Sequence, residues 1–133
     1  PATDRATRAR AHLALAKLAL SDRRFDETER RARAALALDP RNAAALGTLA
    51  VALDDLGRTP EAEAAYRAAL ALDPALYASE FNLALLLAGQ PGRRGEAAEH
   101  LRRYLARAPA DDPRVAEART ALARFSAGGT GGG

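Results

Sequence analysis

An eight-residue sequence, Arg-Ala-Ala-Leu-Ala-Leu-Asp-Pro, occurs at 33–40 and again, unchanged, at 67–74, which is 34 residues later. A looser copy runs from 102 to 109, at a spacing of 35. Upstream of the copies, a leucine followed by an alanine recurs at 15, 49 and 83, again with a spacing of 34 residues. A fixed period of this length is typical of repeat proteins, in which one small structural unit stacks on the next. The chain is therefore expected to contain three similar repeats.

The residues within each repeat predict helices. Alanine, the best helix former, accounts for 36 of the 133 residues, and β-branched and aromatic residues, which favour strands, are scarce. In the second repeat a helix is expected from about 43 to 56, ended by Gly57 in the left-handed conformation. Thr59 is expected to cap a second helix, with Pro60 at its first position. Each repeat is thus expected to be a helix–turn–helix.

This pattern resembles the tetratricopeptide repeat (TPR) family, whose 34-residue helix–turn–helix has small residues at fixed places and a closing proline. The second repeat carries the pattern at Leu46, Leu49, Ala50, Leu53, Gly57, Ala62, Tyr66, Ala69 and Pro74. His12 and Glu80 depart from it, because a large apolar residue is usual there, and Tyr104 is a ring where the other repeats have alanine. The resemblance implies an all-α fold, a right-handed α-solenoid of TPR-like repeats with seven helices.

The expected boundaries follow from the period. They are 1–8 for an N-terminal extension of the first helix, 9–42, 43–76 and 77–111 for the three repeats, 112–126 for a capping helix and 127–133 for a flexible Gly-rich tail. The third repeat has a one-residue insertion in its turn. Asp112-Pro113 is expected to open the capping helix, whose apolar residues, Val115, Ala118, Leu122 and Phe125, have helical spacing. That helix would cover the apolar face of the last repeat.

The family resemblance also implies a binding surface. The first helix of each repeat, helix A, lines a concave groove that receives a peptide in TPR proteins. Carried over by position, the groove residues are Arg10, Leu13, Lys17, Thr48, Val51, Asp54, Asp55, Phe81, Asn82 and Leu85.

Two parts of this groove have a second interpretation. Phe81 and Leu85 either lie open in the groove or pack against neighbouring helices. Asp54 and Asp55 either accept a basic residue of a bound peptide, or Asp54 pairs with Arg58 and Asp55 is solvated.

One function of the family is not expected. The carboxylate clamp, which holds the C-terminal tail of heat-shock chaperones, requires lysine, asparagine and arginine at set positions of helix A. Those positions here are Leu13, Lys17, Thr48, Ala78 and Asn82, none of which is the residue required at its place.

The charge pattern argues against a nucleic-acid-binding surface. The formal net charge is only +3, and acids precede arginines by four residues at Asp4/Arg8, Asp26/Arg30, Glu27/Arg31, Glu29/Arg33, Glu63/Arg67 and Glu99/Arg103. Such pairs support a helix and neutralise its face. RNA-binding helical repeats of similar period read bases through polar pairs, which the apolar row Leu13, Val51 and Phe81 does not supply.

No catalytic, metal or cofactor site is expected. The chain has no cysteine, and His12 and His100 are 88 residues apart. Gly89, Gly92 and Gly95 lack the Lys-Ser/Thr of a phosphate-binding loop. The longest uncharged runs have twelve residues, too few to span a membrane.

We therefore expect a non-catalytic protein–protein interaction module that binds a peptide or partner protein in the helix A groove. The alternatives are a structural spacer or oligomerisation unit of a multidomain protein and, less favoured, an RNA-binding repeat. Because the chain begins at Pro1, it is expected to be part of a longer protein, and its arginine and alanine bias is typical of GC-rich bacteria. A soluble chain is expected, with the cytoplasm favoured over the periplasm; the oligomeric state stays open.

Overall fold

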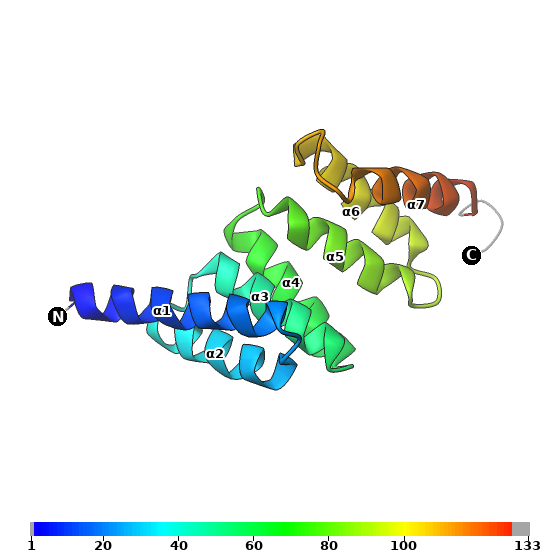
Figure 1. Ribbon diagram of the computed structural model, residues 1–133. Helices are drawn as coiled ribbons and strands as arrows, with labels where there is room; N and C mark the ends of the chain where they lie inside the picture. Colours follow the sequence, from blue (N-terminus) through cyan, green and yellow to red (C-terminus); the bar gives the residue numbers. More distant parts are fainter. Residues whose placement is uncertain (1, 129–133) are drawn as a thin grey trace. The chain divides into compact units, whose positions relative to one another are not determined.

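The computed structural model describes residues 2–128, which form seven α-helices and no strand (Figure 1). The helices are α1 (Ala2–Ser21), α2 (Phe25–Leu38), α3 (Ala43–Asp55), α4 (Thr59–Leu72), α5 (Tyr77–Ala88), α6 (Arg94–Arg107) and α7 (Val115–Gly128). The chain divides into two compact units, Pro1–Pro74 with α1 to α4 and Ala75–Gly133 with α5 to α7. The all-helical fold and the helix–turn–helix repeat are as the sequence predicts.

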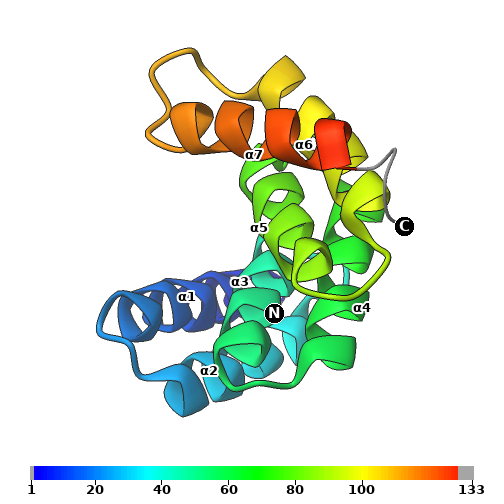
Figure 2. The same ribbon diagram turned by 90° about the vertical axis from the view of Figure 1, so that its right-hand side faces the viewer.

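In unit 1, α1 packs against α2 and α3 against α4, and α2 also packs against α3 (Figures 1 and 2). The helices approach closely because small residues lie at their contacts: Ala50, Ala62 and Ala69 have no exposed surface. Tyr66 and Leu53, exposed by 1% and 2%, fill the space beside them. The second repeat therefore packs with the alternation of large and small residues that its sequence pattern predicts.

The turn between α3 and α4 depends on Gly57, whose φ is +80°. The first repeat has Arg23 at the equivalent position, and this residue adopts the left-handed conformation too, with a φ of 58°. The predicted cap at Thr59 is wrong by one residue: Arg58 occupies the cap position, makes no side-chain capping bond, and Thr59 begins α4. The turn geometry, and not a side-chain cap, therefore starts the helix.

We expect Gly57→Ala and Gly95→Ala to have opposite effects on stability. A Cβ at Gly57 meets no neighbouring atom, but its positive φ costs an L residue about 1–2 kcal/mol. A Cβ at Gly95, in the first turn of α6, also has open space, and there alanine should add up to about 1 kcal/mol by its better helix propensity. Urea denaturation of the two variants checks both signs. Equal shifts would show that backbone conformation does not control these turns.

In unit 2, α5 packs against α6 and α6 against α7. Val115, Ala118 and Phe125 of α7 are buried, as expected for a helix that covers the last repeat. Two predicted boundaries differ. The helix begins at Val115, after Asp112 accepts a hydrogen bond from the Arg114 backbone N–H in the preceding turn. It continues to Gly128, so the expected tail 127–133 begins inside α7, and 129–133 lie outside the described residues.

Glu80, the acid at a repeat position that is usually apolar, and His100 form a buried pair in unit 2. The Nδ1 atom of His100 on α6 lies 2.6 Å from Oε2 of Glu80 on α5. The two residues are 6% and 5% exposed. Because buried polar groups are costly without a partner, each residue makes the other tolerable. The acid at the usual large apolar position is therefore compensated across the helix pair.

Candidate functional site

The helix A surface of unit 1 is formed by α1 and α3. The α1 residues Arg10 and Lys17 are exposed and Leu13 is half-buried. On α3, Val51 is half-buried and Asp55 is exposed. A partner therefore has access to an apolar side chain on each helix, with cations on α1 and acids at the end of α3.

Thr48 does not belong to this accessible surface. Its side chain is buried, at 8% exposure, and its hydroxyl donates a 3.0 Å hydrogen bond to the Ala44 carbonyl one turn earlier. A hydroxyl satisfied by its own helix offers little to a ligand. The prediction of Thr48 as a groove residue is therefore wrong.

Asp54 and Asp55 lie at the C-terminal end of α3, where the helix dipole disfavours negative charge. The alternative in which Arg58 neutralises Asp54 does not hold: Arg58 binds Glu29 of α2 at 2.8 Å and Glu61 of α4 at 2.9 Å. Partial burial, and then the charge of Asp55, raise the pKa of Asp54 above its ordinary value. A cation placed beside these two carboxylates would therefore lower their unfavourable electrostatic energy.

Phe81 belongs to the core of unit 2 and is not open to a partner. It is 4% exposed, and its ring centroid lies 5.3 Å from that of Tyr104 on α6. The Arg114 guanidinium lies over the same ring, at 5.9 Å from its centroid. The prediction of Phe81 as a groove residue is therefore wrong, while Leu85, at 39% exposure, and the half-buried Asn82 remain accessible on α5.

Hydrogen bonds hold the groups that cover Phe81. The Tyr104 hydroxyl donates to Asp112 Oδ1 at 2.6 Å, and Arg114 donates to both oxygens of that carboxylate. Burial, and then the bond to Asp112, raise the pKa of Tyr104 to about 12. The bonds from Arg114, and then from Tyr104, hold the pKa of Asp112 well below its ordinary value. The bulky Tyr104, unusual for the repeat, thus ties α6 to the segment before α7.

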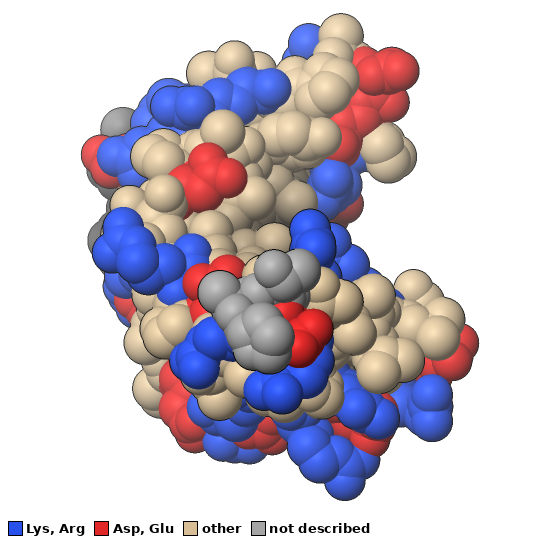
Figure 3. All heavy atoms as spheres, turned by 90° about the vertical axis from the view of Figure 1, so that its left-hand side faces the viewer, with Lys and Arg blue, Asp and Glu red and all other residues tan. Residues whose placement is uncertain are grey.

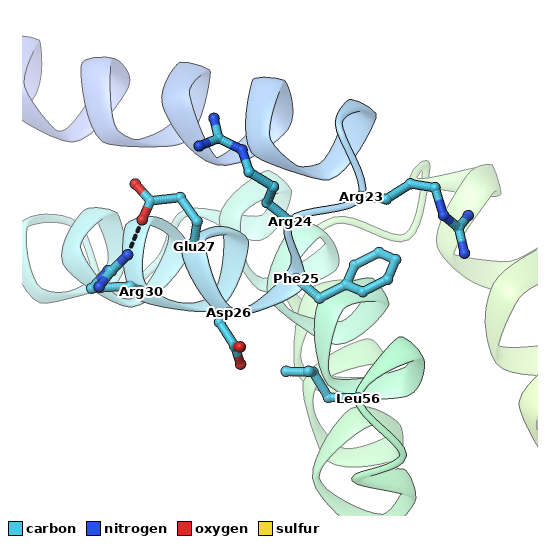
Figure 4. A pocket seen from close by; sticks show the side chains of 7 residues that line it. All are labelled: Arg23, Arg24, Phe25, Asp26, Glu27, Arg30 and Leu56. Atoms are coloured by element: carbon cyan, nitrogen blue, oxygen red, sulfur yellow. Dashed lines mark hydrogen bonds and ion pairs between the residues drawn. The ribbon is translucent and has the colours of Figure 1, made fainter.

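Unit 1 also has a surface depression of about 480 Å³ at the α1–α2 turn and the end of α3 (Figure 4). It is lined by Arg23, Arg24, Phe25, Asp26, Glu27, Arg30 and Leu56. Its cations are engaged within the chain: Arg30 pairs with Glu27, and the Arg23 guanidinium lies 5.3 Å from the Phe25 ring centroid. None of these residues belongs to the predicted groove, and the depression does not concentrate positive charge for an anionic ligand.

Acids and arginines are interleaved on the face drawn in Figure 3. The expected pairs Glu27/Arg31, Glu29/Arg33 and Glu63/Arg67 are present, each at 2.9 Å. Arg30 pairs with Glu27 and not with the predicted Asp26. In residues 2–128, no three His, Asp or Glu side chains are close enough to hold a metal ion. None of the helices in that range is long and apolar enough to cross a membrane.

The comparisons with known proteins identify the repeat. A family model described as tetratricopeptide repeat matches residues 13–77 and 54–112. No curated protein sequence is significantly similar.

Three of the similar solved structures illustrate the fold. The first TPR of Spaghetti (RPAP3), bound to an HSP90 peptide, is 18% identical with a TM-score of 0.82, covering 94% of this chain and 95% of that one. The Yersinia enterocolitica type III secretion chaperone SycD, with a peptide of the translocator YopD, is 16% identical with a TM-score of 0.78, covering 89% and 92%. A Thermobaculum terrenum O-GlcNAc transferase is 25% identical with a TM-score of 0.79, covering 91% of this chain and 22% of that one. Because the family matches span most of the 133 residues, the chain belongs to the tetratricopeptide repeat family.

Proposed function

We propose that this chain is a non-catalytic module that binds a peptide segment of a partner protein on its helix A surfaces. The observation that carries the proposal is the accessibility of Leu13, Val51 and Leu85, apolar residues at the family's groove positions. The opposite sides of α1 and α3 are buried against α2 and α4. Spaghetti and SycD, whose folds are similar, are complexed with peptides in their solved structures.

The side chains around the apolar residues define the kind of peptide. Asp54 and Asp55 favour a basic residue, because a cation there would relieve both their mutual repulsion and the unfavourable helix dipole. Arg10 and Lys17 on α1 favour an acidic residue elsewhere in the same segment. The proposed ligand of unit 1 is therefore an amphipathic or extended segment with an apolar residue and charges of both signs. A chaperone tail held by a carboxylate clamp is not proposed, since the clamp residues are missing.

Asp54→Asn is expected to stabilise the fold at neutral pH while weakening the selection of basic peptides. Because the folded-state pKa of Asp54 is raised, protonation favours the folded state, and the wild type loses stability as the pH rises through that pKa. The melting temperature of the variant should therefore exceed that of the wild type at pH 7, and the difference should vanish in acid. When random displayed peptides are selected for binding to the intact wild-type protein, peptides that contain Arg or Lys should be enriched.

The same selection on Asp54→Asn/Asp55→Asn should lose that basic preference. The matched control Asp26→Asn, at an exposed position of α2, should keep it. The expected loss of affinity for a basic peptide is about three- to fivefold, as for a partly exposed ion pair. Unchanged enrichment on the double variant would contradict the assignment of these carboxylates to the ligand.

A second candidate is a structural spacer or oligomerisation unit of a multidomain protein. It is favoured by the Thermobaculum structure, in which a region similar to this chain makes up 22% of a transferase polypeptide. A spacer would not select peptides, so the experiment above separates the two candidates.

A further inference from the structure

Helix α1 carries an exposed apolar stripe that belongs to no groove position. Leu15 and Leu18 are 42% and 57% exposed, and Ala11 is exposed beside them. Their spacing of four and three residues places them on one helix face. Leu13 and Lys17, the groove residues, lie on a different face of the same helix.

The second repeat shows what covers this stripe when a helix precedes it. The equivalent residues, 34 positions later, are Ala45, Leu49 and Ala52, which are 0%, 5% and 0% exposed. By contrast Ala16 and Ala50, on the side that faces the partner helix within each repeat, are both fully buried. The two repeats differ because α3 has α2 packed before it, whereas the described part of the chain places no helix before α1. The stripe is thus equivalent, by repeat position, to the α3 surface on which α2 packs.

An arginine beside the stripe indicates the charge of that helix. Arg58, in the turn after α3, donates hydrogen bonds from its guanidinium to both carboxylate oxygens of Glu29 on α2, at 2.8 and 3.0 Å. This contact links the second repeat to the preceding helix. The equivalent residue of the first repeat is Arg24, whose side chain is 63% exposed and lies 3.8 Å from Asp22. Because Arg24 is exposed and its ion pair with Asp22 is long, its guanidinium can also bind a carboxylate on a helix that docks as α2 docks on α3.

We infer that Ala11, Leu15, Leu18 and Arg24 form a docking surface, here termed the end surface, for an amphipathic helix with a small apolar face and a glutamate. This surface is separate from the proposed groove. Exposed Arg8, three residues before Ala11, lies on the same helix face and also favours an acidic partner. A second copy of α1 is a poor occupant, because it would place the same cations against each other.

The probe is a peptide with the sequence of α2, Phe25–Leu38, labelled with a fluorophore and hydrocarbon-stapled between positions 30 and 37 to hold it helical. Fluorescence anisotropy with the intact protein should show saturable binding. Leu18→Asp should weaken it at least about tenfold, because it removes an apolar contact and adds a charge. Ala64→Asp, at an exposed position of α4, is the matched control and should bind as the wild type does.

A charge exchange tests the arginine. Arg24→Glu should weaken binding of the α2 peptide, and the peptide substitution Glu29→Arg should restore it. Equal binding by the wild type and Leu18→Asp, or no saturable binding below about 1 mM, would overturn the inference. Self-association or binding to anionic vesicles that Leu18→Asp abolishes would assign the surface to a second copy or a membrane instead, and either result would also overturn it.

Discussion

Replacing either Glu80 or His100 alone by leucine is expected to lower the free energy of unfolding by about 3–5 kcal/mol. The two side chains are buried, and their closest atoms, Nδ1 and Oε2, are 2.6 Å apart. Each single substitution leaves the remaining polar group buried without its partner, and that desolvation cost falls on the folded state. Urea denaturation measures the loss.

The double variant Glu80→Leu/His100→Leu should recover most of the lost stability. It removes both polar groups and restores a large apolar residue at position 80, the usual residue type there, and such replacements are often neutral or stabilising. A double-mutant cycle gives the coupling free energy directly. His12→Leu is the matched control, because His12 occupies the equivalent position of the first repeat and is only half-buried. Losses that simply add in the double variant would contradict a mutually compensating pair.

Leu49→Asp is expected to cost more than about 3 kcal/mol, whereas Leu15→Asp at the same repeat position should cost less than about 1 kcal/mol. Leu49 is 5% exposed and Leu15 is 42% exposed. An aspartate at 49 would be buried without a cation, while an aspartate at 15 would remain in water. Thermal melting of the two variants checks the difference.

The same leucine-to-aspartate change at positions 49 and 15 tests two statements. If both variants lose much stability, the α1 stripe is covered and the end surface does not exist. If both lose little, Leu49 is not a core residue and the alignment of the repeats is wrong. Only the unequal result agrees with a repeat alignment in which the neighbouring helix decides the burial.

The fold could be predicted from the sequence because the repeat encodes local and repeated contacts. The 34-residue spacing places alanines at the same helix crossings in successive repeats, and Gly57 ends α3 in the left-handed conformation. Such features depend on residues close in sequence or one period apart. The all-helical fold and the family can therefore be predicted from the sequence alone.

The site was less predictable because single residues that depart from the repeat control it. Tyr104 and Arg114 bury Phe81. A pattern shared by all three repeats cannot predict this contact, because only the third repeat has a tyrosine at the position of Tyr104. Likewise, the spacing of Asp54 and Arg58 predicts a pair, but Glu29 from the preceding helix competes for the arginine. Long-range partners outweighed the local spacing at both places.

The central claim, that a partner polypeptide binds the helix A surface, is tested most directly by site-specific photo-crosslinking. A photoreactive amino acid would replace Val51 on α3 or, as a control, the exposed Ala68 on α4, in the intact protein exposed to a lysate of its source cells. We expect one discrete polypeptide crosslinked from position 51 and none from position 68. Crosslinks only from position 68, or crosslinks from position 51 to RNA alone, would contradict the claim.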